Sequence, residues 1–203
     1  MAIKAVIFDI GGVLCREESK KHYQKLARTF KFNLEKFKKA REKYIWQALK
    51  RKKKDFWYEI KLAEEMKINP PKFIKKWQAI RSKQIILKKS SKKMLVNLSK
   101  NYFLGTLTNV SHGHDVLREK RKIYKYFKIN LKSCDLAMIK PSIKMFGLLL
   151  KKLKKEKIIS KEVVFIDDFK ENLIPAKKLG MHTILFKNNN QLVHDLKNLG
   201  VKI

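Results

Sequence analysis

The apolar positions along the chain follow two different patterns. Within Ala2–Asp9, a short continuous apolar run ends at the aspartate and is followed by the pair Gly11-Gly12, which predicts a buried strand and then a turn. From about Arg16 to Lys89 the apolar residues are instead three to four positions apart, which predicts several amphipathic helices. The chain therefore begins with one strand and continues into a helical block.

Beyond Ser90 the pattern alternates between strands and helices. The predicted strands cover residues 102–107, 129–131, 163–166 and 183–186, and the predicted helices cover residues 94–98, 142–153, 171–179 and 191–199. Such alternation predicts right-handed crossovers and a parallel sheet covered by helices on both faces.

The fold class that these patterns predict is α/β. Residues 1–15 and 90–203 are expected to form a Rossmann-like parallel sheet domain with helices on both faces, and residues 16–89 an inserted, all-helical domain. A chain of 203 residues with 44% apolar residues is long enough to bury a core. The tryptophans of the helical block (Trp46, Trp57 and Trp77) are expected to pack within it, although one of them could face a substrate.

Composition narrows the cellular setting. The sequence contains no run of 18 apolar residues, and its first 14 residues are too short and too polar at the end for a secretion signal, so we expect a cytoplasmic protein that does not enter a membrane. Cys15 and Cys134 make no disulfide framework and have no zinc-site spacing. Both are expected to be small core residues.

The charge is strongly positive. Lys and Arg number 50 against 18 Asp and Glu, which gives a formal net charge of +32. Only seven of the basic residues are Arg, and the basic residues are scattered along the chain, so we interpret the excess chiefly as a coding bias toward Lys, Ile and Asn. The field should still attract phosphorylated substrates, and it predicts nonspecific nucleic-acid binding at low salt.

Polar residues follow three of the predicted strands. Asp9, Thr108-Asn109 and Asp167-Asp168 stand at strand ends, and Lys140 lies in a loop before a proline. Ligands of open α/β sheets bind outside the carboxyl ends of the strands. Grouped carboxylates bind a hard cation such as Mg²⁺ through oxygen, and an added hydroxyl and ammonium group make a site for a phosphoryl group.

These pieces together resemble the four ordered motifs of the haloacid dehalogenase-like (HAD) hydrolase superfamily. The matching segments are Val6 to Leu14, Leu107 to Asn109, Lys140-Pro141, and Val164 to Asp168 followed by Asn172, Ala176 and Gly180. The resemblance extends from Ile3 to about Phe186. The helical block falls where the first subclass of that superfamily carries a helical cap. The Phe-Asp-x-Gly and Phe-x-Asp-Asp patterns are most similar to the branch that includes sugar-phosphate phosphatases such as α-glucose-1-phosphate phosphatase.

The resemblance implies a nucleophile and a metal site. Asp9 would attack the phosphoryl group and form an aspartyl-phosphate that water then hydrolyses. Mg²⁺ would be held by Asp9, Asp168 and the main-chain carbonyl of Gly11, with Asp167 as a further ligand or as a partner of the ligands.

The resemblance also implies roles for three other residues. Thr108 would donate its hydroxyl to a phosphoryl oxygen, and Asn109 would shape the turn or add a contact. Lys140 would neutralise charge in the transition state and hold Asp9 ionised.

The sequence departs from the family pattern at one position. Most phosphatases of this superfamily carry a second Asp, the general acid and base, two residues after the nucleophile, and here that position is Gly11. Loss of a positioned acid costs ~10² to 10⁴ in rate, and less when the leaving group is a good one. His112, His114 or a residue of the cap could supply the proton instead.

The function that the sequence predicts is a Mg²⁺-dependent phosphatase acting on a small phosphorylated metabolite, with the cap closing over Asp9. One alternative is a metal-free haloacid dehalogenase, in which Asp9 attacks carbon. The other is a protein of the same fold, with weak or no catalysis, that binds nucleic acid or an acidic partner through its basic surface.

Overall fold

A five-stranded parallel sheet forms the centre of the computed structural model, which describes residues 2–15, 20–52 and 55–203. The strand order is β3-β2-β1-β4-β5, and every neighbouring pair is parallel, as the α/β prediction requires. The strands are β1 (Ala5–Phe8), β2 (Phe103–Thr108), β3 (Ile129–Lys132), β4 (Val163–Asp167) and β5 (His182–Leu185). Because all strands run the same way, their carboxyl ends share one edge of the sheet.

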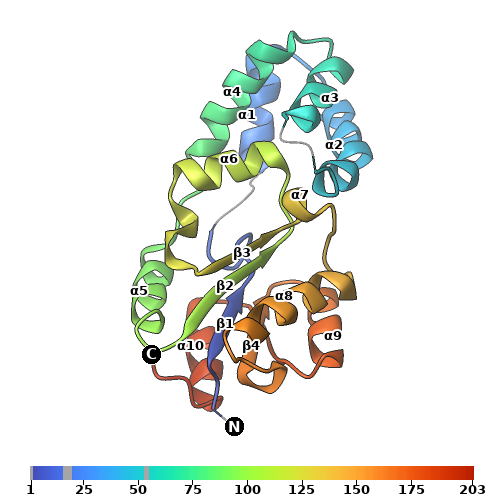
Figure 1. The fold of residues 1–203 in the computed structure, drawn as a ribbon. Helices are drawn as coiled ribbons and strands as arrows, with labels where there is room; N and C mark the ends of the chain where they lie inside the picture. Colours follow the sequence, from blue (N-terminus) through green and yellow to red (C-terminus); the bar gives the residue numbers. More distant parts are fainter. Residues whose placement is uncertain (1, 16–19, 53–54) are drawn as a thin grey trace.

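Helices cover both faces of the sheet. In β1, Val6 and Phe8 belong to the apolar cluster that includes residues of α5 (Lys89–Leu98) and α10 (Asn189–Asn198), whereas Ala5 and Ile7 belong to the cluster of α8 (Ile143–Lys155) and α9 (Lys170–Lys178). Successive side chains of a strand point to opposite faces, so a strand that is apolar throughout is buried between two layers of helices. Figure 1 shows this central strand between the two layers.

The helical block has an aromatic core of its own. Its described helices are α1 (Lys20–Phe30), α2 (Leu34–Leu49), α3 (Trp57–Glu65) and α4 (Pro70–Ser82). Phe37, Phe73 and Trp77 are buried together and make ring contacts with one another. The side chain of Asn69 caps α4 by accepting a hydrogen bond from the backbone N–H of Lys72 at 3.1 Å, as expected before the two prolines that begin this helix.

Figure 1 shows these four helices at one end of the molecule, beyond the edge of the sheet where the strands end. Several contacts join them to the rest of the chain, among them three that involve polar side chains. Gln78 donates to the carbonyl of Gly113 at 2.9 Å, Arg121 donates to the carbonyl of Ser82 at 2.7 Å, and Arg81 contacts His114. The division into domains at residues 15/16 and 89/90 stays a prediction, and its first boundary borders residues 16–19, which lie outside the described residues.

The structure contains helices that the sequence patterns do not indicate. They are α6 (His112–Lys120), α7 (Ser133–Leu136) and the 3-10 turns η1 (Ile123–Tyr126) and η2 (Ser160–Glu162). Helix α6 escapes detection because polar residues, Asp115 and Arg118, are buried at helical spacing where apolar ones are normally found.

Other local expectations have mixed outcomes. Cys15 and Cys134 are buried free thiols, as predicted. Trp77 is buried, but Trp46 is 59% exposed, so the expectation that Trp46 packs within the helical block is wrong. Among the helices of the described residues, none combines the length and apolar character needed to cross a membrane.

Candidate active site

Two aspartates and a lysine meet at the edge of the sheet where the strands end. Asp9 directly follows β1, Asp167 is the last residue of β4, and Lys140 lies in the loop before α8. The ammonium Nζ of Lys140 is 2.8 Å from Asp9 Oδ1 and 2.6 Å from Asp167 Oδ2. All three residues are buried. The predicted convergence of these side chains is therefore present in the structure.

The lysine remains charged in this setting. Burial alone would lower the pKa of Lys140, but the neighbouring Asp9 and Asp167 carboxylates outweigh it and raise the pKa above its usual value. The Asn109 side chain fixes the lysine backbone: its Oδ1 accepts from the N–H of Lys140 at 2.8 Å, and its Nδ2 donates to the Lys140 carbonyl at 3.1 Å. In the structure Asn109 therefore positions the lysine.

Asp167 is held from several sides. Besides Lys140, its carboxylate accepts hydrogen bonds from the backbone N–H of Phe169 at 2.8 Å and from the side-chain amide of Asn172 at 3.0 and 3.1 Å. These donors already occupy the oxygens of Asp167. Asp167 therefore suits a supporting role, in which it contacts residues that bind the metal, better than direct binding of the metal.

The carboxylates suit a divalent cation. Asp9, Asp167 and Asp168 each offer an oxygen, and these oxygens all lie within 4.8 Å of one another. No described residue hydrogen-bonds to the buried Oδ1 of Asp168. Burial, together with the Asp9 and Asp167 carboxylates, raises the pKa of Asp168 to about 6. Oxygen ligands with excess negative charge are the donor set that Mg²⁺ prefers, so these residues fit the predicted metal.

The glycine turn after β1 packs directly against this carboxylate. Gly12 has φ +73°, and a Cβ added to it would lie 2.0 Å from Asp168 Oδ2. Only a glycine allows this backbone conformation and this approach together. The turn therefore carries Gly11 to the metal-binding edge, and the use of the Gly11 carbonyl as a ligand stays a prediction.

Thr108 differs from the other predicted residues in its contacts. It is the last residue of β2, it is fully buried, and its Oγ1 accepts a hydrogen bond from Arg118 Nη1 at 3.0 Å. Among the described residues, no hydrogen bond joins Thr108 to the cluster of Asp9, Lys140 and Asp167. The bond from the arginine occupies one lone pair of the threonine oxygen and leaves its O–H able to donate.

A cavity of about 240 Å³ lies between the helical block and the end of β2. Asn109 and Ser111 line it from the core side, and Glu59 and Arg81 line it from the helical block. His114 also lines it, on α6 instead of in a loop, and its Nδ1 lies 2.9 Å from Arg81 Nη2. Burial and the charges of Arg81 and Arg118 lower the pKa of His114 well below its usual value.

Sequence reasoning did not single out Glu59, Arg81 or Arg118. Glu59 is 1% exposed and Arg118 is fully buried. Each stands within a helix that is rich in charged residues, where it is indistinguishable from a solvated neighbour. The weak signal that could have found Arg118 is its spacing from Ser111 and Asp115, which places all three polar residues on one helix face.

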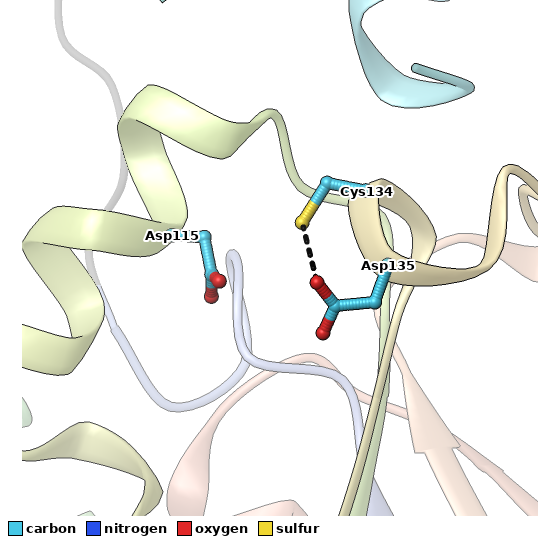
Figure 2. A group of neighbouring side chains, drawn as sticks. All are labelled: Asp115, Cys134 and Asp135. Atoms are coloured by element: carbon cyan, nitrogen blue, oxygen red, sulfur yellow. Dashed lines mark hydrogen bonds between the residues drawn. The ribbon is translucent and has the colours of Figure 1, made fainter. Parts of the chain in front are cut away.

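A second group of possible metal ligands lies nearby, at Asp115, Cys134 and Asp135 (Figure 2). Lys132 already provides the cation there, because its Nζ is 2.6 Å from Asp115 Oδ2 and 3.3 Å from Asp135 Oδ2. Burial and the two carboxylates raise the pKa of the Cys134 thiol to about 12, so the thiolate needed for metal binding is disfavoured. We assign no metal to this group.

Comparisons with known proteins agree with the geometry. The family model described as "Haloacid dehalogenase-like hydrolase" matches residues 6–186. A HAD family enzyme from Bacteroides thetaiotaomicron has the same fold, with a TM-score of 0.79 and 21% identity over 97% of this chain and 99% of that one. A 2-haloacid dehalogenase from Pseudomonas syringae also shares the fold, with a TM-score of 0.65 and 17% identity over 91% of this chain and 86% of that one.

Curated relatives match a shorter segment. The chain is 37% identical over 78 residues to the bifunctional epoxide hydrolase 2 of Mus musculus and 33% identical over 90 residues to that of Rattus norvegicus. These segments are 38% and 44% of this chain but only 14% and 16% of the relatives.

Proposed function

We propose a specific activity from one premise: the chain belongs to the haloacid dehalogenase-like hydrolase family, whose model matches it over residues 6–186. Within this family we assign it to the Mg²⁺-dependent phosphatases that hydrolyse a small phosphorylated metabolite through an aspartyl-phosphate. A sugar phosphate is the first candidate substrate, because the motifs resemble the sugar-phosphate phosphatase branch.

The observation that carries the proposal is the bridge from Lys140 to both Asp9 and Asp167, next to an oxygen of Asp168 to which no described residue hydrogen-bonds. A phosphate ester brings two negative charges toward a carboxylate nucleophile, so a phosphatase needs positive charge at the point of attack. The buried ammonium supplies one such charge, and a cation held by Asp9 and Asp168, with Asp167 beside them, would supply the rest.

Each residue of the site has its own role in the proposed reaction. Lys140 holds Oδ1 of Asp9, which fixes the orientation of the carboxylate that attacks phosphorus. The ester oxygen leaves as the Asp9–phosphorus bond forms, and water later attacks this phosphorus and releases phosphate. We assign to Thr108 the donation of its hydroxyl to a phosphoryl oxygen, and Asn109 keeps Lys140 in position. When bound by Asp9, Asp168 and the carbonyl of Gly11, Mg²⁺ would offset the charge between nucleophile and substrate.

The comparisons support this choice indirectly. The Bacteroides thetaiotaomicron enzyme, at 22% identity and a TM-score of 0.76, has also been solved in complex with magnesium and inorganic phosphate. Those ligands belong to that protein, and its shared fold makes them reasonable first probes for this one.

The test is phosphate release by the purified chain from a panel of phosphorylated metabolites that includes α-glucose 1-phosphate. We expect turnover that requires Mg²⁺, stops on addition of EDTA, and is absent in Asp9→Asn. Turnover that is equal with and without EDTA would contradict the metal-dependent mechanism.

The same preparation tests the dehalogenase alternative. A 2-haloacid such as 2-chloropropionate is added in EDTA, and chloride is measured. Release of chloride that depends on Asp9, with no phosphate release from the panel, would replace the phosphatase by a dehalogenase.

A further inference from the structure

The proposed reaction requires a proton for the leaving oxygen, and Gly11 has no side chain that could provide it. We propose that Glu59, on helix α3 of the helical block, gives this proton to the leaving group and later takes one from the attacking water. This inference rests on the proposed phosphatase function and assigns a catalytic residue that lies outside the family motifs of the sequence.

Glu59 lines the cavity where a leaving group would lie. It provides the one carboxyl group among the described residues that line this cavity of about 240 Å³. The opposite wall includes Asn109, which is hydrogen-bonded to Lys140, and Lys140 in turn contacts the nucleophile Asp9. Through Asn109 the cavity borders the residue that positions Lys140, and the Glu59 carboxyl group lies on its other wall.

The carboxyl group is buried but not fully satisfied. Glu59 is 1% exposed, and no described residue hydrogen-bonds to its Oε2. A buried carboxyl oxygen without a partner is costly unless something else uses it. The hydroxyl of a bound substrate is the kind of group that would satisfy this oxygen.

A glycine on α6 makes room for the carboxyl group. A Cβ added to Gly113 would lie 2.3 Å from Glu59 Oε1 and 2.8 Å from Oε2, so no other residue fits at this position without displacing the glutamate. Gly113 is in the first turn of α6, so the Glu59 carboxyl group lies beside the amino-terminal turn of this helix.

The groups around Glu59 allow both of its protonation states at neutral pH. Burial raises the pKa of Glu59 to about 7, whereas its own backbone N–H, Arg81 and Trp77 lower it and Asp55 raises it further. A general acid works best when its pKa is near the working pH.

His114 is the main competitor in the same cavity. Its pKa is lowered well below the usual value, so its imidazole is neutral at pH 7, and its Nδ1 faces the Arg81 guanidinium. A neutral imidazole is a weak proton donor, which leaves Glu59 as the better acid.

The proposed steps balance. An Asp9 oxygen bonds to phosphorus, the bond from phosphorus to the ester oxygen breaks, and that oxygen takes the proton of Glu59 to leave as an alcohol. The Glu59 carboxylate then accepts a proton from water, whose oxygen bonds to phosphorus as the Asp9–phosphorus bond breaks. Phosphate leaves, and Glu59 is protonated again.

The test compares two esters whose leaving groups differ in basicity, glycerol phosphate and p-nitrophenyl phosphate. For Glu59→Gln we expect kcat/KM on glycerol phosphate to fall by ~10² to 10⁴, and on p-nitrophenyl phosphate by less than about 10, because nitrophenolate leaves without a proton. The wild-type kcat/KM on glycerol phosphate should decline above pH about 7, and Glu59→Gln should lose this decline. The matched control is Glu64→Gln on the same helix, whose exposed side chain pairs with Lys61 and should keep wild-type behaviour.

Equal losses on both esters, or an unchanged pH profile in Glu59→Gln, would overturn the assignment of Glu59 while leaving the phosphatase in place. If wild-type protein releases no phosphate from either ester in an Asp9-dependent way, the proposed function fails and this inference fails with it. If Glu59→Gln does not fold, Glu59→Asp is used, which should keep the decline above neutral pH at a lower rate. A flat profile for Glu59→Asp would also overturn the assignment.

Discussion

Charged side chains inside this protein are stabilised by specific partners. Lys140 is 2% exposed and touches two carboxylates, which is the arrangement that lets a buried ammonium keep its charge. The same rule covers Lys132, which contacts Asp115 in the neighbouring group. Loss of one partner in such a network leaves a buried charge without compensation.

Lys140→Met is therefore expected to destabilise the protein by about 3 to 5 kcal/mol, because Asp9 and Asp167 would face each other without the ammonium. Urea unfolding measures this difference, and Mg²⁺ should restore part of it by binding to the carboxylates. Lys144→Met, at an exposed position of the following helix, is the control and should change stability little. An unchanged unfolding midpoint in Lys140→Met would show that the bridge contributes no stability.

Glu59 gives a second prediction, which concerns stability and not catalysis. Its pKa rises from 4.5 to about 7 on folding, so the folded state binds the proton more tightly and loses stability as the pH rises through this window. Glu59→Gln removes this loss. Between pH 4 and pH 8, wild type should lose about 3 kcal/mol of its free energy of unfolding through this group, since one pKa unit corresponds to about 1.4 kcal/mol. The variant should not show this loss, so the difference between variant and wild type should grow by the same amount. Parallel pH profiles for the two proteins would contradict the raised pKa.

Helices α6 and α8 differ in how well the sequence predicts them. In α8 the buried residues Met145, Phe146, Leu149 and Leu153 follow the helical period, so the sequence predicts a helix at residues 142–153. In α6 the buried face carries Asp115 and Arg118, whose partners come from β2, β3 and η1. Those partners lie up to 17 residues away in sequence, and local periodicity contains no information about them.

Helix α8 also contains a glycine with no structural purpose that we can find. Gly147 is exposed, and a Cβ added there would meet no atom within 4 Å. Gly147→Ala should stabilise the protein by about 0.5 to 1 kcal/mol, through the lower backbone entropy of alanine in the unfolded chain. Thermal unfolding should show a melting temperature about 2 to 4 °C higher per kcal/mol. A lower melting temperature would contradict the conclusion that Gly147 has no structural role.

At the scale of the whole molecule, the sequence predicts the elements and the position of the active site but not the packing between domains. Asp9, Lys140 and Asp167 could be named because parallel strands bring their ends to one edge, and the family motifs mark the same positions. Glu59 and Arg81 could not be named from the sequence. Their place in the cavity depends on how the helical block packs on α6, and this packing rests on long-range contacts such as that of Gln78 with Gly113. Residues that the helical block contributes to the cavity are therefore the least predictable part of the candidate site.

The charge of +32 gives a prediction for the intact protein. The protein should bind a DNA duplex of arbitrary sequence in 50 mM salt. Its affinity for this duplex should fall by about 10³ or more at 200 mM salt, because the release of counterions from the DNA becomes less favourable as the salt concentration rises. Asp9→Asn should behave like wild type in this assay. Affinity that persists at 200 mM salt would contradict the interpretation of the charge as a coding bias and favour the nucleic-acid-binding alternative.

The central position of β1 has a consequence for how this protein is made. Ala5 pairs with Phe103 on one side and with Val163 on the other, so both neighbours of β1 are synthesised much later than β1 itself. The helical block can acquire its aromatic core in the meantime, since all residues of that core lie between β1 and β2 in the chain. Until translation passes β4, at least one edge of this apolar strand remains unpaired in the nascent chain, where chaperones that recognise such segments would bind it.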